Sequence, residues 1–334
     1  MTDRVFITTT GNGLARASRD AGAQWQVEQV LAGSDLRCLA ADPLNTERIY
    51  AGTQGQGVLR SDDHGRTWRR AGLAGQVVKA IAASPIRQAV VYAGTKPAGI
   101  FVSHDGGDSW AELAAFRRIP GRWLWLSPAE RPHIGYVQAI ALSPTDPQRL
   151  VVGIEAGATV LSSDGGRTWT GHRSGALRDC HTLTFHATQG ERVYASGGGM
   201  AGWGTSAFSR DAGRTWATSR AGLDRSYGWA VAADPVRPEV WYLSASPGPF
   251  KAHSKNNAQA FIYRNEGTSW RQLAGGLPQP LDHMPYALLI ERGAPGQIYA
   301  GLSNGDIWQS ADYGEQWAQL PVNLGRIERS LVML

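Results

Sequence analysis

The sequence predicts an all-β fold, a ring of seven four-stranded blades, and three observations lead to this conclusion. A motif of the form Ser-x-Asp-x-Gly-x-Thr-Trp occurs seven times, with varying fidelity, along the 334 residues. Successive motif tryptophans are 42 to 59 residues apart. The segments between them are short, alternating, and rich in β-branched and aromatic residues, which is typical of β-strands. Repeats of about this length that contain several short strands indicate a β-propeller. We therefore expect a single domain over residues 1–334.

The repeated motif predicts a tight turn between the third and fourth strands of each blade. Its central Asp can accept hydrogen bonds from backbone N–H groups, and the Gly two residues later tolerates positive φ. The Trp offers an apolar anchor for packing between neighbouring units. The clear copies are SDDHGRTW, SHDGGDSW, SSDGGRTW and SRDAGRTW, the looser ones SRDAGAQW and SADYGEQW, and the worn one YRNEGTSW.

These turns resemble the Asp-box, or BNR repeat, found in sialidases, two-propeller xyloglucanases, sortilin-type receptors and photosystem assembly factors. The resemblance covers essentially the whole chain. It implies that the boxes are structural turns remote from any ligand site.

Each repeat also carries three strand-like segments before its box, which we label A, B and C, with strand D beginning at the box Trp. In one repeat they are residues 80–85, 91–95 and 99–103. The N-terminal residues 5–10 match a strand B, whereas residues 330–334 match a strand A that nothing follows. We therefore expect the C-terminal strand to complete the N-terminal blade, which closes the ring and removes exposed edges.

Strand order predicts which loops share a face. In an up-and-down blade the A–B and C–D turns lie on one face, and the B–C turns and inter-blade connections lie on the other. Three enlarged connections, residues 115–137, 197–204 and 246–259, belong to the second face. We expect function on that face, because loops on a rigid scaffold carry sites.

The first residues of the A strands should line the mouth of the central channel on the same face. They are cationic, polar or aromatic: Arg37, Lys79, Gln138, His181, Trp229, Tyr286 and Arg329. We interpret them as a binding ring for a small polar or anionic ligand. The alternative is an ordinary polar channel filled with water. Further candidate ligand-binding residues are Arg225, Trp123, Trp125 and Trp203.

An enzyme at this mouth would need a general acid or base, and histidine titrates near neutrality. The candidates are His181 and His283, with Tyr227, Tyr286 or Glu155 assisting. For each histidine the alternative is a hydrogen bond to loop backbone. No metal-ligand spacing stands out around Cys180 and His181, so neither a metal nor a cofactor is expected.

The features that give the individual members of this family their activities are only partly present in this sequence. Residues 116–120, FRRIP, resemble the sialidase Phe-Arg-Ile-Pro motif, but they follow the third box, contain an extra Arg and sit in seven repeats rather than six. Xyloglucanases place paired Asp residues between two propellers, and this sequence provides one propeller. The photosystem assembly factors bind protein through a basic surface. The segment that carries Trp123 and Trp125 among arginines is therefore a lid, a docking patch for a partner, or a loop anchored by its tryptophans.

Composition narrows the classes of partner and the cellular location that the protein could have. The net charge of +5 mildly favours anionic partners, but without a dense Lys/Arg run we expect no nucleic-acid binding. No apolar run reaches membrane-spanning length and no leader pattern precedes the first strand, so we expect no membrane insertion and a cytoplasmic location. Cys38 and Cys180 are expected to be buried free thiols. The favoured function is a binding or scaffold protein for a protein partner or an anionic ligand. The alternative is a glycosidase-like hydrolase, a lyase or a hydratase.

Overall fold

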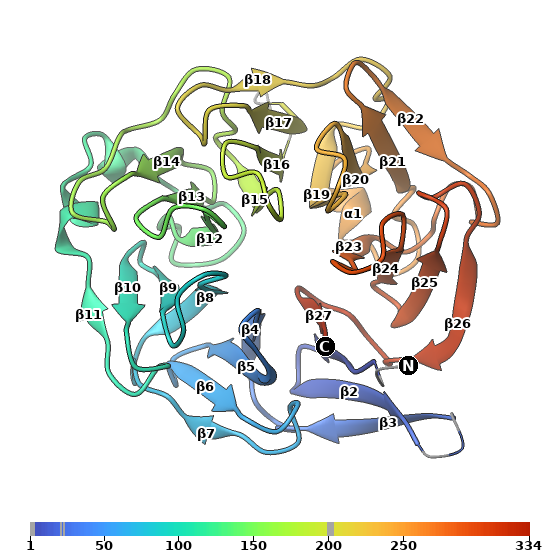
Figure 1. Cartoon of the computed structure of the whole chain (residues 1–334), viewed down its shortest axis with the longest axis horizontal. Coiled ribbons are helices and arrows are strands. Elements are labelled where there is room, and N and C mark those ends of the chain that lie inside the picture. Colours follow the sequence, from blue (N-terminus) through green and yellow to red (C-terminus); the bar gives the residue numbers. More distant parts are fainter. Residues whose placement is uncertain (1–3, 21, 23, 199–203) are drawn as a thin grey trace.

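The computed structural model describes residues 4–20, 22, 24–198 and 204–334, and it is a ring of seven sheets around a central channel (Figure 1). The predicted seven-bladed propeller is confirmed. Blade 1 joins β27 (Leu331–Met333) to β1 (Phe6–Thr9), β2 (Leu14–Arg19) and β3 (Trp25–Val30). Blade 2 contains β4 (Leu36–Asp42), β5 (Asn45–Thr53), β6 (Val58–Ser61) and β7 (Arg69–Arg70). Blade 3 contains β8 (Val77–Ala83), β9 (Val91–Lys96), β10 (Ile100–Ser103) and β11 (Ala111–Glu112).

The other four blades repeat this order. Blade 4 has β12 (Val137–Leu142), β13 (Leu150–Ile154) and β14 (Thr159–Ser162). Blade 5 has β15 (Cys180–Phe185), β16 (Val193–Gly197), β17 (Ser206–Ser209) and β18 (Ala217–Thr218). Blade 6 has β19 (Tyr227–Ala233), β20 (Val240–Ser246), β21 (Phe261–Glu266) and β22 (Trp270–Leu273). Blade 7 has β23 (Pro285–Ile290), β24 (Ile298–Leu302), β25 (Asp306–Ser310) and β26 (Ala318–Asn323).

Blade 4 departs from the expected four strands. After β14 only an isolated bridge between Leu161 and Thr170 takes the place of a fourth strand. The chain then leaves the sheet, and the ring nitrogen Nδ1 of His172, rather than a backbone carbonyl, accepts the N–H of Thr159 at 3.3 Å. A side chain thus replaces the next rung of the ladder.

The ring closes as the sequence predicts. The C-terminal β27 pairs antiparallel with β1, with Phe6 opposite Met333 and Thr8 opposite Leu331. The hydroxyl of Thr8 donates to the carbonyl of Ser330 at 2.8 Å, and the Oγ of Ser330 accepts the N–H of Leu39 in blade 2 at 3.1 Å. The last strand therefore covers the edge of β1 and joins it to the next blade.

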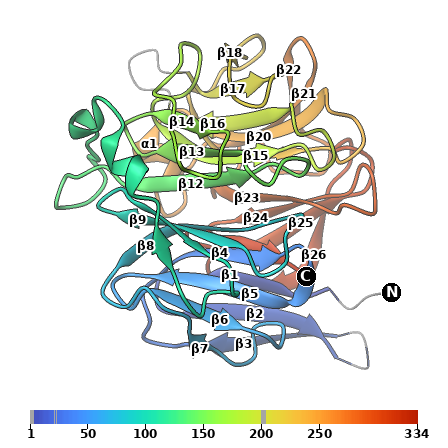
Figure 2. The same ribbon diagram turned by 60° about the vertical axis from the view of Figure 1, so that its left-hand side comes forward.

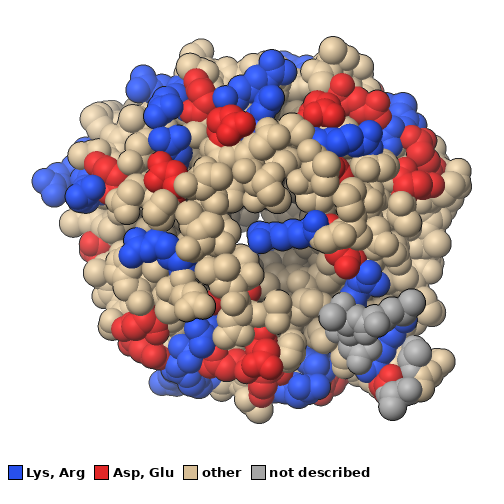
Figure 3. Space-filling view, viewed as in Figure 1, with Lys and Arg blue, Asp and Glu red and all other residues tan. Residues whose placement is uncertain are grey.

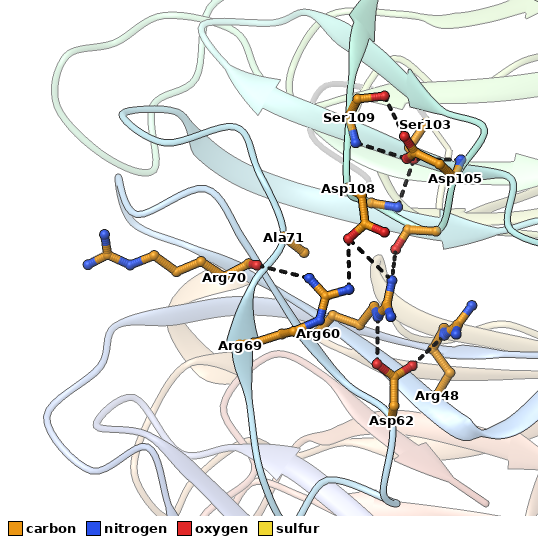
Figure 4. Close-up of polar contacts among 12 residues, drawn as sticks. Arg48, Arg60, Asp62, Arg69, Arg70, Ala71, Ser103, Asp105, Asp108 and Ser109 are labelled. Carbon is orange, nitrogen blue, oxygen red and sulfur yellow. Dashed lines mark hydrogen bonds and ion pairs between the residues drawn. The ribbon is translucent and has the colours of Figure 1, made fainter.

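The boxes behave as turn-stabilising units. In the box of blade 2, the Oγ of Ser61 accepts the N–H of Gly65 at 2.9 Å, and Asp63 accepts the N–H and hydroxyl of Thr67 at 2.9 and 2.6 Å. His64 and Gly65 both have positive φ, 58° and 81°, which brings these N–H groups toward the two side chains. Figure 4 shows the equivalent contacts of Asp105 with Ser103 and Ser109 in blade 3.

In five blades the box is also tied to the A–B turn of the same blade. In blade 2 the N–H of His64 donates to the carbonyl of Glu47 at 2.9 Å, and in blade 5 the N–H of Ala212 donates to that of Glu191 at 2.7 Å. Box tryptophans reach the preceding blade, as where the Nε1 of Trp110 donates to the carbonyl of Ala71 at 2.7 Å. The boxes and the A–B turns therefore form one face.

Glycine in the second strand lets neighbouring blades approach closely. A Cβ on Gly52 in β5 would lie 2.5 Å from the Sγ of Cys38 and 2.7 Å from the carbonyl oxygen of Val78 in blade 3. The Ala-Gly pair that recurs in the B strands thus reflects inter-blade packing. Cys38 and Cys180 are buried in these layers as free thiols.

The views in Figures 1 and 2 place the functional elements. The connection between β11 and β12 and the short helix α1 (Pro249–Ala252) lie toward the same side of the ring when it is seen edge-on (Figure 2). The space-filling view shows the face that is turned toward the viewer in Figure 1; it is hollowed at its centre and carries side chains of both charges (Figure 3). Among the described residues, no helix has the length and apolar character needed to cross a membrane.

We predict that deleting residues 330–334 lowers the free energy of unfolding by roughly 3–5 kcal/mol, because it removes buried Leu331 and the hydrogen bonds that cover β1. The exposed edge should also promote aggregation. Thermal unfolding and size-exclusion chromatography measure both effects. A truncated chain that melts like the full chain would contradict the closure role.

We also predict that Asp63→Ala lowers the free energy of unfolding by about 1–3 kcal/mol, because several backbone and hydroxyl donors of the turn lose their acceptor. The matched control is Asp62→Ala in the same box. Asp62 is partly exposed and makes only ion pairs to Arg48 and Arg60 (Figure 4), which are worth less than about 1 kcal/mol. Urea unfolding of the two variants distinguishes them, and equal losses would argue against the box interpretation.

The box carboxylate also makes stability depend on acid. Burial alone would raise the pKa of Asp63, but hydrogen bonds from Thr67 and Ser61 lower it to about 2. A depressed folded-state pKa contributes stability that is present above about pH 4 and is lost as the pH falls toward 2. Asp63→Ala should therefore lose less stability than the wild type between pH 4 and pH 2, as measured by urea unfolding across that range.

Candidate functional site

A cavity of about 590 Å³ lies at the end of the channel where the inner strands begin. The strands β4, β8, β12, β15, β19 and β23 all start there, so their first residues converge. All seven residues that the sequence analysis assigned to the binding ring line this cavity: Arg37, Lys79, Gln138, His181, Trp229, Tyr286 and Arg329. Tyr227 and Glu155, which were assigned assisting roles, also line it.

A recurring β-bulge explains why these side chains point into the cavity. The pairing of β4 with β5 skips from Leu36 to Cys38, which leaves Arg37 unpaired. The same shift occurs in five other blades, where it leaves out Lys79, Gln138, His181, Tyr286 and, with one additional residue, Trp229. A bulge bends its strand and re-aims a side chain, and it is frequent beside functional sites.

One side of the cavity is cationic and is organised around a single carboxylate. Glu130, from the long connection between β11 and β12, lies 2.5 Å from the Nζ of Lys79, 3.3 Å from the Nζ of Lys96 and 3.4 Å from Arg37. Both lysine ammonium groups lie over the ring of Tyr136, at 4.5 and 5.7 Å from its centroid. Three basic groups thus converge on a position that holds a carboxylate.

Burial and charge shift the protonation of this cluster. Burial lowers the pKa of Lys79 to about 8, against the opposing effect of its hydrogen bond to Glu130. Burial alone would raise the pKa of Glu130, but the hydrogen bond from Lys79 and the surrounding cations hold it below its usual range. Glu130 therefore carries a full negative charge near neutrality, whereas Lys79 begins to lose its proton just above it.

Arg329 is a basic lining residue with only weak internal pairing. Its guanidinium lies 3.7 Å from Glu328, and its side chain is 34% exposed. It reaches the cavity from the segment that precedes β27, so ring closure delivers it. It is therefore well placed to pair with an incoming anion.

A hydrogen-bonded row of aromatic groups forms another wall. The hydroxyl of Tyr227 lies 2.9 Å from the Nε2 of His253, and the Nδ1 of His253 lies 2.7 Å from the hydroxyl of Tyr286. The hydroxyl of Tyr286 then donates to the carbonyl of Ala252. Trp229 packs against His181, His253 and Tyr286, with ring centroids 4.7 to 5.2 Å apart. The wall is consequently rigid and offers aromatic surface to a ligand.

A third group combines acid and imidazole. Glu155 follows β13, and Asp179 and His181 lie at the start of β15; all three are buried. The Nδ1 of His181 lies 2.7 Å from the carbonyl of Gly228, so this nitrogen carries the hydrogen. Burial raises the pKa of Glu155 above its usual range.

Residues 1–263 match a protein family described as the DUF6242 beta propeller domain. The chain belongs to this family. No curated protein matches its sequence.

Solved structures support the same architecture for this DUF6242 propeller. A GH74 xyloglucanase from Xanthomonas campestris is 20% identical, with a TM-score of 0.68 over 96% of this chain and 52% of that one. An ancestral GH74 enzyme is 17% identical, with a TM-score of 0.65 over 85% of this chain and 38% of that one. YCF48 bound to D1 peptide is 14% identical, with a TM-score of 0.56 over 86% of this chain and 80% of that one. The chain therefore spans about half or less of the two GH74 enzymes, and the likeness shows the fold alone.

Several residues predicted for the site are not brought to it. His283 does not line the cavity of this DUF6242 propeller, whereas the alternative candidate, His181, does. Arg225 stacks on Phe261 at 4.3 Å and donates to the carbonyl of Gln259 at 2.9 Å, away from the lining. Trp203 lies outside the described residues.

The two tryptophans of the long connection play different parts. Trp125 is buried against Phe116, with ring centroids 5.8 Å apart, and anchors the connection to the core of blades 3 and 4. Trp123 is 79% exposed, and the neighbouring Leu124 and Leu126 are exposed as well. Trp125 therefore anchors the loop, as one of the three alternatives predicted, whereas Trp123 faces solvent.

Sequence reasoning missed Glu130 and gave no partners for His253. Glu130 lies in a connection without strand periodicity, so no register places it. His253 was located on the correct face, but its two tyrosine partners come from different blades. The acidic residue in a long connection on the loop-rich face was the available signal for Glu130.

Proposed function

We propose that this chain is a binding propeller whose central cavity takes the carboxylate group of a polar ligand. The observation that carries the proposal is the position of Glu130, whose carboxylate is held by Lys79, Lys96 and Arg37. The cavity thus already binds a carboxylate supplied by its own chain. Charge-assisted hydrogen bonds of this kind are the strong ones in a partly buried site.

The rest of the cavity suits the remainder of such a ligand. Arg329 provides a loosely paired cation, and Trp229 and Tyr286 provide aromatic surface. A volume of about 590 Å³ falls within the usual range of small-molecule sites. A ligand carboxylate would pair with Arg329 or displace Glu130 from Lys79.

The carboxylate can belong to a small molecule or to an acidic residue of a peptide. Two observations favour a peptide. One neighbour of the same fold, YCF48, is bound to the D1 peptide. The connection that carries Glu130 also exposes Trp123, Leu124 and Leu126, which a short cavity ligand would leave in water.

An enzyme at the same mouth has less support. Of the two histidines expected to act in catalysis, His283 lies outside the cavity lining and His181 is bonded to the backbone of Gly228. His253, which does line the cavity, is held between two tyrosines. His181 does lie at the cavity with Tyr227, Tyr286 and Glu155, so a catalytic role would depend on this group and not on His283.

We predict opposite effects for two substitutions at one contact. Lys79→Ala should weaken binding of a carboxylate ligand about tenfold or more, whereas Glu130→Ala should strengthen it, because an internal competitor is removed. The probes are citrate, galacturonate and a hexaglutamate peptide, with the amide analogues as neutral controls, measured by isothermal titration calorimetry at fixed ionic strength.

Arg225→Ala is the matched control, since that arginine lies away from the cavity lining and its loss should leave affinity unchanged. If the wild type prefers the hexaglutamate peptide to the small carboxylates and Trp123→Ala reduces this preference, the natural ligand is a peptide. If Trp123→Ala leaves the affinity for the peptide unchanged, the natural ligand is a small molecule. If no carboxylate binds wild type or Glu130→Ala, the proposed function is wrong.

Binding should also weaken as the pH rises through about 8, the pKa of Lys79. The charged ammonium of Lys79 attracts the ligand carboxylate. Its contribution to the binding affinity is therefore fully present below pH 7 and is lost as the pH rises above the pKa of Lys79. The titratable or charged groups around it are Arg37, Lys96, Glu130, Tyr136, Glu155 and Arg329. Lys79→Arg is the control, because arginine stays charged. The difference between the two pH profiles from pH 6.5 to 9 measures the contribution of Lys79, and identical profiles would exclude it.

A further inference from the structure

Glu155, Asp179 and His181 form a compact cluster at the cavity wall. One potential ligand atom from each lies within 4.8 Å of the other two, and their exposed fractions are only 8%, 8% and 6%. Glu155 comes from the end of β13 in blade 4, and the other two come from the start of β15 in blade 5. The cluster is therefore built across a blade interface, with Glu155 and His181 facing the cavity.

The carboxylate of Glu155 has no hydrogen-bond partner among the described residues, although the residue is more than nine-tenths buried. An unpartnered carboxylate at such a position is costly, and a second carboxylate, that of Asp179, lies beside it. The local charge needs a proton or a cation to balance it. This is the observation that distinguishes the cluster from an ordinary group of acidic residues.

The other two side chains are oriented as ligands. Because the Nδ1–H of His181 donates to the carbonyl of Gly228 at 2.7 Å, its Nε2 keeps a free lone pair and lies 3.7 Å from the Oδ2 of Asp179. The backbone N–H of Ala156 binds the Oδ1 of Asp179 at 3.2 Å, which leaves Oδ2 available. A histidine whose second nitrogen donates to a backbone carbonyl is the usual arrangement of a metal ligand.

We propose that Glu155, Asp179 and His181 bind a divalent transition-metal cation, with Zn²⁺ or Mn²⁺ matching the donor set. Two carboxylates and one imidazole supply three ligands, and the cavity leaves a further coordination position open. Ligand distances of about 2.0–2.2 Å require the donor atoms to close slightly, which side-chain rotation provides. The site goes beyond carboxylate binding and does not depend on it, since none of its ligands contacts Glu130.

This site was missed because its ligands are far apart in sequence and lie on different blades. The sequence predicts no metal around the adjacent Cys180–His181 pair. The thiol of Cys180 indeed belongs to the layer between the blades, where a Cβ on Gly153 would meet it at 2.8 Å. The ligand beside His181 is instead Asp179, one residue before the strand.

The test uses tag-free full-length protein that has been treated with a chelator and then titrated with ZnCl₂ or MnCl₂ alone. At about one hundred times the dissociation constant, the metal should raise the midpoint of thermal unfolding by about 5 °C. Calorimetry should show one site per chain. Glu155→Gln should weaken binding at least tenfold, and Asp62→Asn, which removes a carboxylate of a box turn on the other face, should bind the metal like the wild type.

A readout without metal separates this role from a purely structural one. If the role of Glu155 is to bind metal, Glu155→Gln without metal should unfold at or above the midpoint temperature of the metal-free wild type, because a buried charge is removed. The same variant should lose the rise in midpoint temperature that the metal causes. The Co²⁺ form should show visible absorption bands that His181→Gln abolishes. No thermal shift in the wild type, or an equal shift in Glu155→Gln, would show that a proton balances the cluster and would overturn the proposal.

Discussion

The hydrogen bonds of the box turns are the constraint on which the rest of the molecule depends. In each well-formed box a serine and an aspartate accept hydrogen bonds from backbone N–H groups of the turn. The box is also hydrogen-bonded to the A–B turn of its own blade. One face of the blades with well-formed boxes is thereby fixed in the same way. Because that face is fully engaged in holding the sheets, variation in connection length falls on the other face, where the 115–137 connection and α1 lie.

The inner strands convert this repeated scaffold into a site. A bulge near the start of six inner strands removes one residue from the ladder and turns its side chain toward the channel. Ring closure supplies the remaining blade, because the segment before β27 brings Arg329 to the cavity and Ser330 bonds to Leu39. Ring closure and the lining of the cavity therefore involve the same few residues.

Much of this could be predicted from the sequence, because the information is periodic. The box spacing determines the number of blades, and alignment on the Ser-Pro or Asp-Pro that ends an inner strand identifies Arg37, Lys79 and Gln138 as equivalent. Where periodicity ends, the sequence left alternatives open or gave no prediction that the structure bears out. Glu130 lies in a non-repetitive connection, the burial of Trp125 depends on the packing of Phe116, and the place of His283 depends on a loop conformation. The neighbours of such residues are set by tertiary structure.

The cavity has an unusual separation of charge, and this limits what it can hold. On one side basic groups gather around Glu130, and on the other Glu155 and Asp179 lie together beside His181. Because charges interact more strongly in a partly buried cavity than in water, a ligand whose charges complement these two groups should bind more tightly than an uncharged ligand. A purely apolar ligand would displace water from both groups without pairing with either, which is why the arrangement favours a ligand with an anionic group directed toward Lys79 and Arg329.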